Sequence, residues 1–186
     1  TGDAENRVRH ELADAMGEEV SPEAILLANS GANAFYALFR TARDILATQG
    51  RTIWIQLGWL YVDTIKVLEK FMDGQDEVVA MHNVTDLSRL RRLFAERGGE
   101  IAAVVTETPT NPLFQTCDLD ELRDLCRTYG AMLVADPTMA SPRNAKVSGH
   151  ADVIVNSLTK YAANEGDVML GCLAFPKHST FREVLC

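Results

Sequence analysis

Residues 101–136 read IAAVVTETPTNPLFQTCDLDELRDLCRTYGAMLVAD, and they decide the fold. The β-rich apolar run over 101–105 is typical of a strand that is buried on both faces of a sheet. The segment Asp118-Leu119-Asp120-Glu121 resembles a capping box and predicts the beginning of a helix that ends at Gly130. A second apolar run, over 132–135, predicts another buried strand. Strands that alternate with helices in this way indicate an α/β sandwich with a largely parallel sheet.

The same alternation continues on both sides of this stretch. Apolar residues at helical spacing predict helices, and short apolar runs predict strands. The expected helices lie over 4–16, 33–48, 62–71 and 86–97, and the expected strands lie over 25–28, 53–57, 77–81 and 153–155. We find no repeat, low-complexity segment or linker. We therefore expect one α/β domain, a three-layer sandwich around a mainly parallel sheet.

Length and charge limit what the chain can be. It has 186 residues, of which 47% are hydrophobic, so it can bury a core without help from disulfides or a metal. Its formal net charge of −8 argues against nucleic acid and anionic membrane surfaces as partners, because both are polyanions. No apolar run approaches the roughly 20 residues that span a bilayer. The sequence thus predicts a globular protein with neither nucleic acid nor membrane as its partner.

The cysteines and histidines show no metal-site pattern. The four cysteines (Cys117, Cys126, Cys172 and Cys186) form no CxxC pair, and the four histidines form no HxxxH pair. We therefore expect no metal site, and we interpret the cysteines as reduced thiols of a cytoplasmic protein. Residues 1–5 lack the basic start and the apolar stretch of a signal peptide.

Parallel sheets of this class bind ligands at the carboxyl ends of their strands, which directs attention to the residues that follow each strand. Lys160 follows the strand over 153–155, and lysine can form a Schiff base with an aldehyde. The neighbouring hydroxyls of Ser157 and Thr159 can hold a phosphate. Asp136 follows the strand over 132–135, and a carboxylate there can keep a pyridinium nitrogen protonated. Taken alone, each has an ordinary interpretation: a surface lysine, and a helix cap or turn former.

Three other strand ends carry weaker signals. Ser30-Gly31-Ala32 leads into a helix, whose free N–H groups and positive dipole end can bind a phosphate, although small residues also cap helices. Tyr61 can stack on a flat ring, although a lone tyrosine is often core or surface. Asn111 can donate a hydrogen bond to a ring hydroxyl, although its loop, residues 107–112, can equally be a turn with a cis Asn111-Pro112 bond. The chain contains neither a Walker loop nor GxGxxG.

Together and in this order, these segments resemble the Cys/Met-metabolism family of pyridoxal-phosphate (PLP) enzymes, such as cystathionine γ-synthase, cystathionine lyases, methionine γ-lyase and homoserine sulfhydrylases. The resemblance covers nearly the whole chain and is most specific over 107–171. It is carried by Ser30-Gly31-Ala32, 61–64, 107–112, 135–138, 151–161, 167–168 and Gly171. It implies the large domain of a fold-type I PLP transferase. It also implies a PLP-dependent carbon–sulfur lyase or transferase of sulfur amino-acid metabolism, acting by β- or γ-elimination or γ-replacement.

The resemblance implies a role for each site residue. Lys160 and Tyr61 would be catalytic: Lys160 would bind PLP as a Schiff base and then move protons, and Tyr61 would stack on the ring and assist proton transfer. Asp136 would pair with the ring nitrogen, and Asn111 would lie near the ring hydroxyl. The phosphate would be bound by Gly31, Ala32, Ser157 and Thr159.

The chain departs from the family pattern beside the expected cofactor. Val62 and Asp63 replace two glycines of a Tyr-Gly-Gly-Thr segment, which adds bulk and a charge. Ala32 replaces a methionine, Pro137 replaces an asparagine, and Asn164-Glu165 replace a Gly-His pair. These changes leave PLP binding expected, and they leave the substrate open among lyase, synthase and sulfhydrylase activities.

Family members are longer than this chain. The resemblance therefore implies that residues 1–186 are the PLP-binding large domain, without the N-terminal arm and the C-terminal small domain that complete the site. It also implies an amino-acid substrate and a homo-oligomer, because the family's sites lie at dimer interfaces. Two alternatives stay open: a catalytically inactive, self-associating module, and another branch of the fold such as a sugar aminotransferase. The segments over 107–112 and 157–160 argue against the latter.

Overall fold

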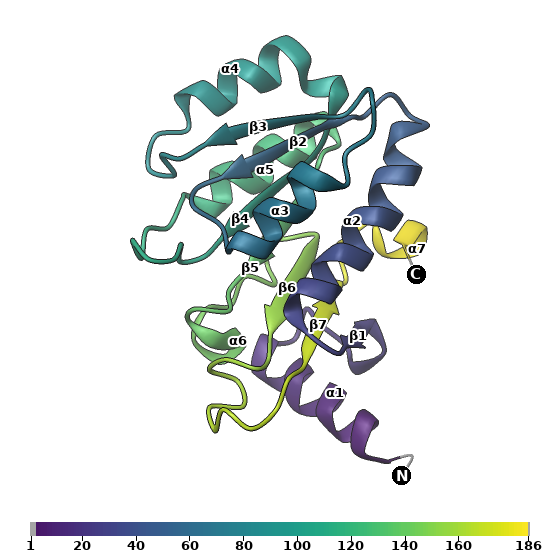
Figure 1. Ribbon diagram of the computed structural model, residues 1–186, viewed down its shortest axis with the longest axis vertical. Helices are drawn as coiled ribbons and strands as arrows, with labels where there is room; N and C mark the ends of the chain where they lie inside the picture. The colour runs from purple at the N-terminus through teal and green to yellow at the C-terminus, as the bar shows by residue number, and fades with distance from the viewer. Residues whose placement is uncertain (1–2, 186) are drawn as a thin grey trace.

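A seven-stranded sheet in the order β1-β7-β6-β5-β4-β2-β3 forms the centre of the computed structural model, which describes residues 3–185 (Figure 1). Its strands are β1 (Ile25–Ala28), β2 (Ile53–Leu57), β3 (Glu77–Met81), β4 (Ile101–Glu107), β5 (Met132–Asp136), β6 (Val153–Ser157) and β7 (Gly171–Ala174). Neighbouring strands from β3 through β2, β4 and β5 to β6 are parallel. The predicted α/β class and the mainly parallel sheet are confirmed.

The strand β7 was not predicted, and it is antiparallel to both β6 and β1. Its four residues, Gly-Cys-Leu-Ala, are too short and too mixed to give a periodic signal. Parallel neighbours require a crossover connection, usually a helix. The chain between β6 and β7 forms no helix and returns directly, so β7 runs in the opposite direction.

Helices cover both faces of the sheet. The helices are α1 (Asp3–Met16), α2 (Gly31–Ala47), α3 (Val62–Lys70), α4 (Ser88–Arg97), α5 (Leu119–Tyr129), α6 (Ser141–Asn144) and α7 (Arg182–Leu185), with 3-10 turns at Pro22–Ala24 and Gly98–Glu100. One face packs against α2 and α3 through a core that includes Phe39 and Trp54. The other face packs against α1, α4 and α5 through a core that includes Phe94 and Leu122. The five longer helices confirm the predicted ones, with α2 beginning at Gly31 because Ser30 caps it.

Capping side chains fix where α2 and α5 begin. The Ser30 hydroxyl accepts from the N–H of Asn33 at 3.1 Å, and the Asp118 carboxylate accepts from the N–H of Glu121 at 3.0 Å. Such caps satisfy N–H groups that have no partner inside a helix. The first turn of α2, which Ser30 caps, lies against Ser157 at the carboxyl end of β6.

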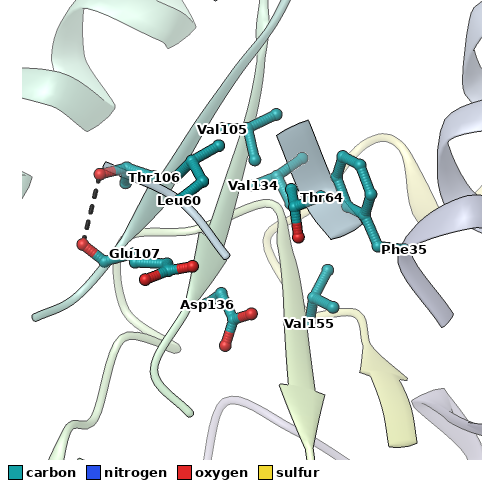
Figure 2. A pocket seen from close by; sticks show the side chains of 9 residues that line it. All are labelled: Phe35, Leu60, Thr64, Val105, Thr106, Glu107, Val134, Asp136 and Val155. Atoms are coloured by element: carbon teal, nitrogen blue, oxygen red, sulfur yellow. Dashed lines mark hydrogen bonds between the residues drawn. The ribbon is translucent and has the colours of Figure 1, made fainter. Parts of the chain in front are cut away.

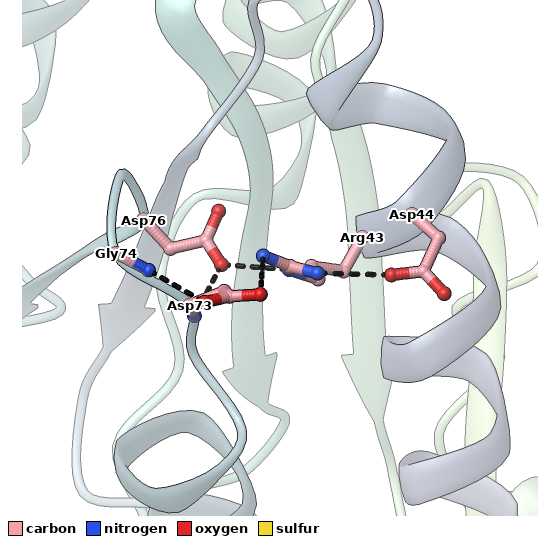
Figure 3. Close-up of polar contacts among 5 residues, drawn as sticks. All are labelled: Arg43, Asp44, Asp73, Gly74 and Asp76. Carbon is pink, nitrogen blue, oxygen red and sulfur yellow. Dashed lines mark hydrogen bonds and ion pairs between the residues drawn. The ribbon is translucent and has the colours of Figure 1, made fainter.

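Two arginines brace the opposite edge of the sheet. Arg43 of α2 pairs with Asp76 at 2.7 Å and with Asp73 at 3.3 Å, both in the turn before β3 (Figure 3). Arg51, just before β2, donates to the carbonyl oxygens of Ile101 at 2.9 Å and Tyr129 at 2.8 Å. These contacts lie at the amino ends of the strands, opposite the carboxyl ends where the candidate site lies.

Within residues 3–185, no helix is long and apolar enough to cross a membrane. The same residues contain no group of three or more His, Cys, Asp or Glu side chains that could hold a metal ion. Three cysteines in this range (Cys117, Cys126 and Cys172) are free and buried.

Candidate active site

Two carboxyl groups lie side by side at the carboxyl edge of the sheet. Glu107 ends β4 and Asp136 ends β5, and the two residues are register partners across the parallel strands. Both line a narrow hollow between the sheet and the helices α2 and α3, together with Phe35, Leu60, Thr64, Val105, Thr106, Val134 and Val155 (Figure 2). Of the two, Asp136 was a predicted site residue, and Glu107 was known only as part of the loop motif.

The apolar lining changes the acidity of both carboxyl groups. Burial raises the pKa of Glu107 to about 7, and the neighbouring Asp136 contributes to that rise. Burial also raises the pKa of Asp136 to about 6. A buried carboxylate is stabilised by a cation or by N–H donors, and without a cation it holds its proton more tightly. The pair is therefore suited to a ligand that brings a positive charge.

Glu107 connects three segments of the site. Its carboxylate accepts hydrogen bonds from the backbone N–H of Tyr61 and, at 3.2 Å, from the backbone N–H of Asn111. Tyr61 lies at the cap position of α3, and its side chain is 46% exposed. The predicted cis bond at Asn111-Pro112 is present, and Thr108-Pro109 is cis as well. The structure therefore brings Tyr61, Asn111 and Asp136 to one place around the Glu107 side chain.

Thr138 connects the ends of β5 and β6. Its backbone N–H donates to the Asp136 carboxylate at 2.9 Å, and its hydroxyl oxygen accepts from the backbone N–H of Ser157 at 2.8 Å. This orients Asp136 and places Ser157 beside it. Thr138 was not predicted as a site residue, although it belongs to the 135–138 segment that carries the family resemblance.

The first turn of α2 lies directly against the ends of β6 and β7. A Cβ atom added to Gly31 would lie 2.8 Å from Cβ of Ser157, and one added to Gly171 would overlap the backbone of Ser30 and Gly31. Only glycine permits this approach. The N–H groups of Gly31 and Ala32 belong to a first helical turn, where no intrahelical partner exists. The structure thus brings Gly31, Ala32 and Ser157 together, and their role in phosphate binding stays a prediction.

Lys160 follows closely after β6. Its backbone N–H donates to the Ser157 carbonyl oxygen at 3.3 Å, and its carbonyl oxygen accepts from the N–H of Asn164 at 2.9 Å. Its side chain is exposed. The neighbouring Thr159 is predicted to bind phosphate through its hydroxyl. In the structure this hydroxyl donates to the Leu170 carbonyl oxygen and accepts from the Leu170 N–H. A phosphate would have to compete for that hydroxyl proton, so the phosphate role of Thr159 stays a prediction.

The sequence matches the family model of the Cys/Met metabolism PLP-dependent enzymes over residues 3–184. The chain belongs to this family.

Two curated members of the family are similar over most of the chain. An L-2-amino-4-chloropent-4-enoate dechlorinase/desaturase from Streptantibioticus cattleyicolor is 40% identical over 164 residues, which are 88% of this chain and 32% of that protein. A cystathionine γ-synthase from Neurospora crassa is 33% identical over 165 residues, 88% of this chain and 26% of that protein. The chain therefore spans a third or less of the length of these two curated relatives.

Solved structures share the fold. A putative O-acetylhomoserine (thiol)-lyase from Campylobacter jejuni, whose structure holds N'-pyridoxyl-lysine-5'-monophosphate, superimposes with a TM-score of 0.76 at 22% identity, over 94% of this chain and 40% of that one. A cystathionine γ-lyase from Micromonospora echinospora gives a TM-score of 0.69 at 24% identity, over 95% and 45%. The chain has the α/β fold of the fold-type I PLP enzymes.

The residues of this Cys/Met-metabolism chain fit PLP chemically. The glycine-lined turn at the beginning of α2 offers N–H groups to a phosphate. Asp136 offers a half-buried carboxylate to a ring nitrogen, and Lys160 offers an amine to an aldehyde. Sequence reasoning missed Glu107 and Thr138, because their contacts with Tyr61 and Ser157 join segments that are distant in the chain.

Proposed function

We propose that residues 1–186 form the PLP-binding large domain of an enzyme that catalyses elimination or replacement at the β- or γ-carbon of an amino acid. The expected substrates are sulfur amino acids and their relatives: cystathionine, methionine or activated homoserine. One observation carries the proposal: in a chain of this family, Asp136, the segment Ser157–Lys160 and the first turn of α2 meet at one sheet edge.

Each residue has a defined task in this proposal. When bound, PLP supplies an electron sink that stabilises negative charge at the substrate Cα. Asp136 holds the proton on the ring nitrogen, and that positive charge would lower the raised pKa of Asp136. Lys160 binds the cofactor and moves protons between the substrate carbons and the leaving group. Gly31 and Ala32 bind the phosphate through their N–H groups.

Tyr61 and Asn111 complete the set. The half-exposed ring of Tyr61 covers one face of the cofactor ring, and Asn111 orients the ring hydroxyl. Ser157 adds a hydroxyl near the phosphate, beside Gly31. The Thr159 hydroxyl would join it after exchanging its bond with Leu170.

A second candidate activity is elimination of halide in place of a sulfur leaving group. The relative named as a chloro-amino-acid dechlorinase/desaturase is 40% identical, against 33% for a cystathionine γ-synthase. Both reactions expel a leaving group from a side-chain carbon, so the same acid–base residues serve both. Val62 and Asp63, at the beginning of α3 beside Tyr61, are the positions where this chain differs from the usual glycines.

We also propose that the protein is a homo-oligomer, as members of this family typically are. Large apolar side chains stand exposed after β2, β4 and β6, around the site. They are Trp59, Tyr61, Val62, Leu113, Phe114, Tyr161, Val168 and Met169. Apolar exposure concentrated at one edge is typical of an interaction surface. Light scattering on the intact natural protein tests this, and a monomer at micromolar concentration would contradict it. The free buried thiols support a cytoplasmic location.

The decisive experiment uses the intact natural protein. It should show a visible absorption band of bound PLP, and borohydride reduction followed by peptide mapping should find the cofactor on Lys160. Release of pyruvate, 2-oxobutyrate or chloride from cystathionine, methionine, O-acetylhomoserine and 2-amino-4-chloropent-4-enoate would assign the reaction. Lys160→Ala should abolish turnover, and the exposed Lys177→Ala should not. A label on another lysine would contradict the site, and labelled Lys160 without any turnover would favour the inactive module.

A further inference from the structure

We propose that Glu107 is a positioning residue of the cofactor site, whose carboxylate holds the segments carrying Tyr61 and Asn111 against the ends of β4 and β5. The inference rests on the proposed function and assigns a role to a residue outside the predicted site. Glu107 touches neither the predicted phosphate groups nor Lys160 in the hydrogen bonds of the described residues. It acts through the residues that it orients.

The Glu107 side chain is buried at the carboxyl end of β4. The residue ends β4, is 6% exposed, and lines the hollow between the sheet and α2 and α3 (Figure 2). A buried carboxylate is costly unless N–H donors satisfy it. Here the donors are the N–H groups of Tyr61 and Asn111. The carboxylate and the two segments therefore depend on one another.

The loop that carries Asn111 has few backbone N–H donors. Two prolines, Pro109 and Pro112, supply no N–H, so residues 108–112 contain N–H donors only at Thr108, Thr110 and Asn111. Thr108 donates to the Asp136 carbonyl oxygen at 2.9 Å, and Thr110 donates to the Gln115 carbonyl oxygen at 2.9 Å. The remaining donor, that of Asn111, goes to Glu107 at 3.2 Å. Glu107 thus supplies the one side-chain acceptor for the backbone of this loop.

Tyr61 supplies the other backbone N–H that Glu107 accepts. Its N–H stands at the cap position of α3, outside the helical ladder, and Tyr61 makes no side-chain capping bond. Glu107 accepts this N–H across 46 positions of sequence. It thereby fixes the backbone from which the Tyr61 ring projects. A carboxylate can accept from both donors at once, whereas a glutamine amide presents one acceptor oxygen and one NH₂ donor.

The charge of Glu107 is coupled to that of Asp136, its register partner on β5. Asp136 is the other titratable group that lines the hollow. The elements packed against it contribute uncharged side chains to the lining, which are Phe35 from α2, Thr64 from α3 and Val155 from β6. A positive ring nitrogen at Asp136 would relieve the repulsion between the two carboxyl groups and so favour ionised Glu107. Ionised Glu107 is the better acceptor for the N–H groups of Tyr61 and Asn111. Binding of PLP would then tighten the two segments that face it.

Single-amide hydrogen–deuterium exchange on the cofactor-free intact natural protein tests the role directly. Glu107→Gln replaces one of the two acceptor oxygens with NH₂, so exchange should become about tenfold faster at the amide, of Tyr61 or of Asn111, that loses its hydrogen bond to the charged group. The Thr108 amide, which donates to the Asp136 backbone, should be unchanged. Glu96→Gln, on the exposed face of α4, is the matched control and should leave all three amides at the wild-type rate.

Two measurements separate positioning from general weakening. Glu107→Gln should weaken PLP binding about tenfold and alter the visible circular dichroism of bound PLP, which reports ring orientation, whereas Glu96→Gln should do neither. If Glu107→Gln does not fold, amide hydrogen exchange in the wild-type protein between pH 6 and 8 tests the positioning role. After correction for intrinsic rates, protection at Tyr61 and Asn111 against local openings that leave Glu107 buried should rise with pH, because the two hydrogen bonds favour the ionised carboxylate.

The outcomes are distinguishable. The positioning role is overturned if the Tyr61 and Asn111 amides of Glu107→Gln exchange at the wild-type rate. It is also overturned if their protection in the wild-type protein does not change with pH. Both conclusions hold even when borohydride labels Lys160. Failure to label Lys160 would overturn the proposed function, whatever the exchange rates. Faster exchange together with unchanged PLP affinity and an unchanged dichroism spectrum would reduce Glu107 to a loop contact and would also overturn the inference.

Discussion

The Thr159 hydroxyl binds the backbone of Leu170 twice, donating to its carbonyl oxygen at 3.2 Å and accepting from its N–H at 3.0 Å. The backbone N–H of Thr159 donates to the same carbonyl oxygen at 3.2 Å. These bonds close the loop over 160–169, which contains Lys160 and the exposed side chains of Tyr161 and Met169. The geometry of the lysine segment therefore depends on a threonine that sequence reasoning assigned to phosphate binding.

Replacing this threonine should open the loop. Thr159→Val keeps the shape and removes both side-chain hydrogen bonds, so we expect a loss of about 2 kcal/mol in the free energy of unfolding and faster proteolysis within 160–169. Urea unfolding and limited proteolysis of the intact natural protein measure the two effects. Thr159→Ser keeps the hydroxyl and should restore most of the loss. Equal stability of the valine and serine variants would show that the hydroxyl bonds contribute nothing.

The contact between Gly171 and the first turn of α2 should not tolerate a side chain. Gly171→Ala places a methyl group onto the Ser30 carbonyl and the Gly31 nitrogen, which are backbone atoms and cannot rotate away. We expect destabilisation of about 1–3 kcal/mol and weaker PLP binding, because the phosphate-binding turn must move. Gly149→Ala is the control, since nothing lies within 4 Å of its added Cβ. Wild-type PLP affinity in Gly171→Ala would contradict the expected role of this turn.

The sequence predicted what is local and periodic. Buried strands such as Ile101–Glu107 and capped helices such as Leu119–Tyr129 carry their own signals, and the strand-end rule directed attention to Asp136 and Lys160. The strand Gly171–Ala174 carried no such signal, because its place and direction follow from the lack of a helix after β6. Contacts between distant segments could not be predicted either.

Glu107 and Thr159 illustrate that limit. The sequence placed both beside the site, but it could not show which atoms their polar groups would meet. Glu107 accepts the N–H of Tyr61, 46 positions away, and the Thr159 hydroxyl meets the backbone of Leu170. Both contacts depend on how loops close after strands pair. Residue type and spacing therefore predict which groups gather at the edge of the sheet, and the tertiary structure decides which of them stay free for a ligand.

The ion pairs around Arg43 should stabilise the edge opposite the site. The Asp76 side chain is 1% exposed and accepts from the Arg43 guanidinium and from the Asp73 N–H (Figure 3). Arg43→Met leaves this buried carboxylate without its cation, so we expect a loss of about 3 kcal/mol. Asp76→Asn in the same chain should recover part of that loss, because the unpaired charge is gone. Urea unfolding of the single and double variants measures the coupling, and strictly additive losses would contradict it.

The contribution of the carboxyl pair to the stability of the cofactor-free protein should fall as pH rises. Burial and mutual repulsion raise the pKa of Glu107 to about 7, and burial raises the pKa of Asp136 to about 6. The unfolded chain releases these two protons near pH 4, so between about pH 4 and 7 the pair binds more protons in the folded protein than in the unfolded chain. The contribution of the pair to the free energy of unfolding must then decrease through this range, by on the order of 3 kcal/mol for Glu107.

Glu107→Gln should therefore flatten the dependence of stability on pH between 5 and 7, whatever constant loss it causes by removing hydrogen bonds. All other carboxyl groups remain in both proteins, so the difference between the two slopes isolates Glu107 and its effect on Asp136. Urea unfolding at pH 5, 6, 7 and 8 measures it, with Glu96→Gln as the exposed control. Bound PLP should flatten the wild-type slope as well, because a positive ring nitrogen favours both carboxylates. Parallel slopes for wild type and Glu107→Gln would show that Glu107 ionises normally in the folded protein.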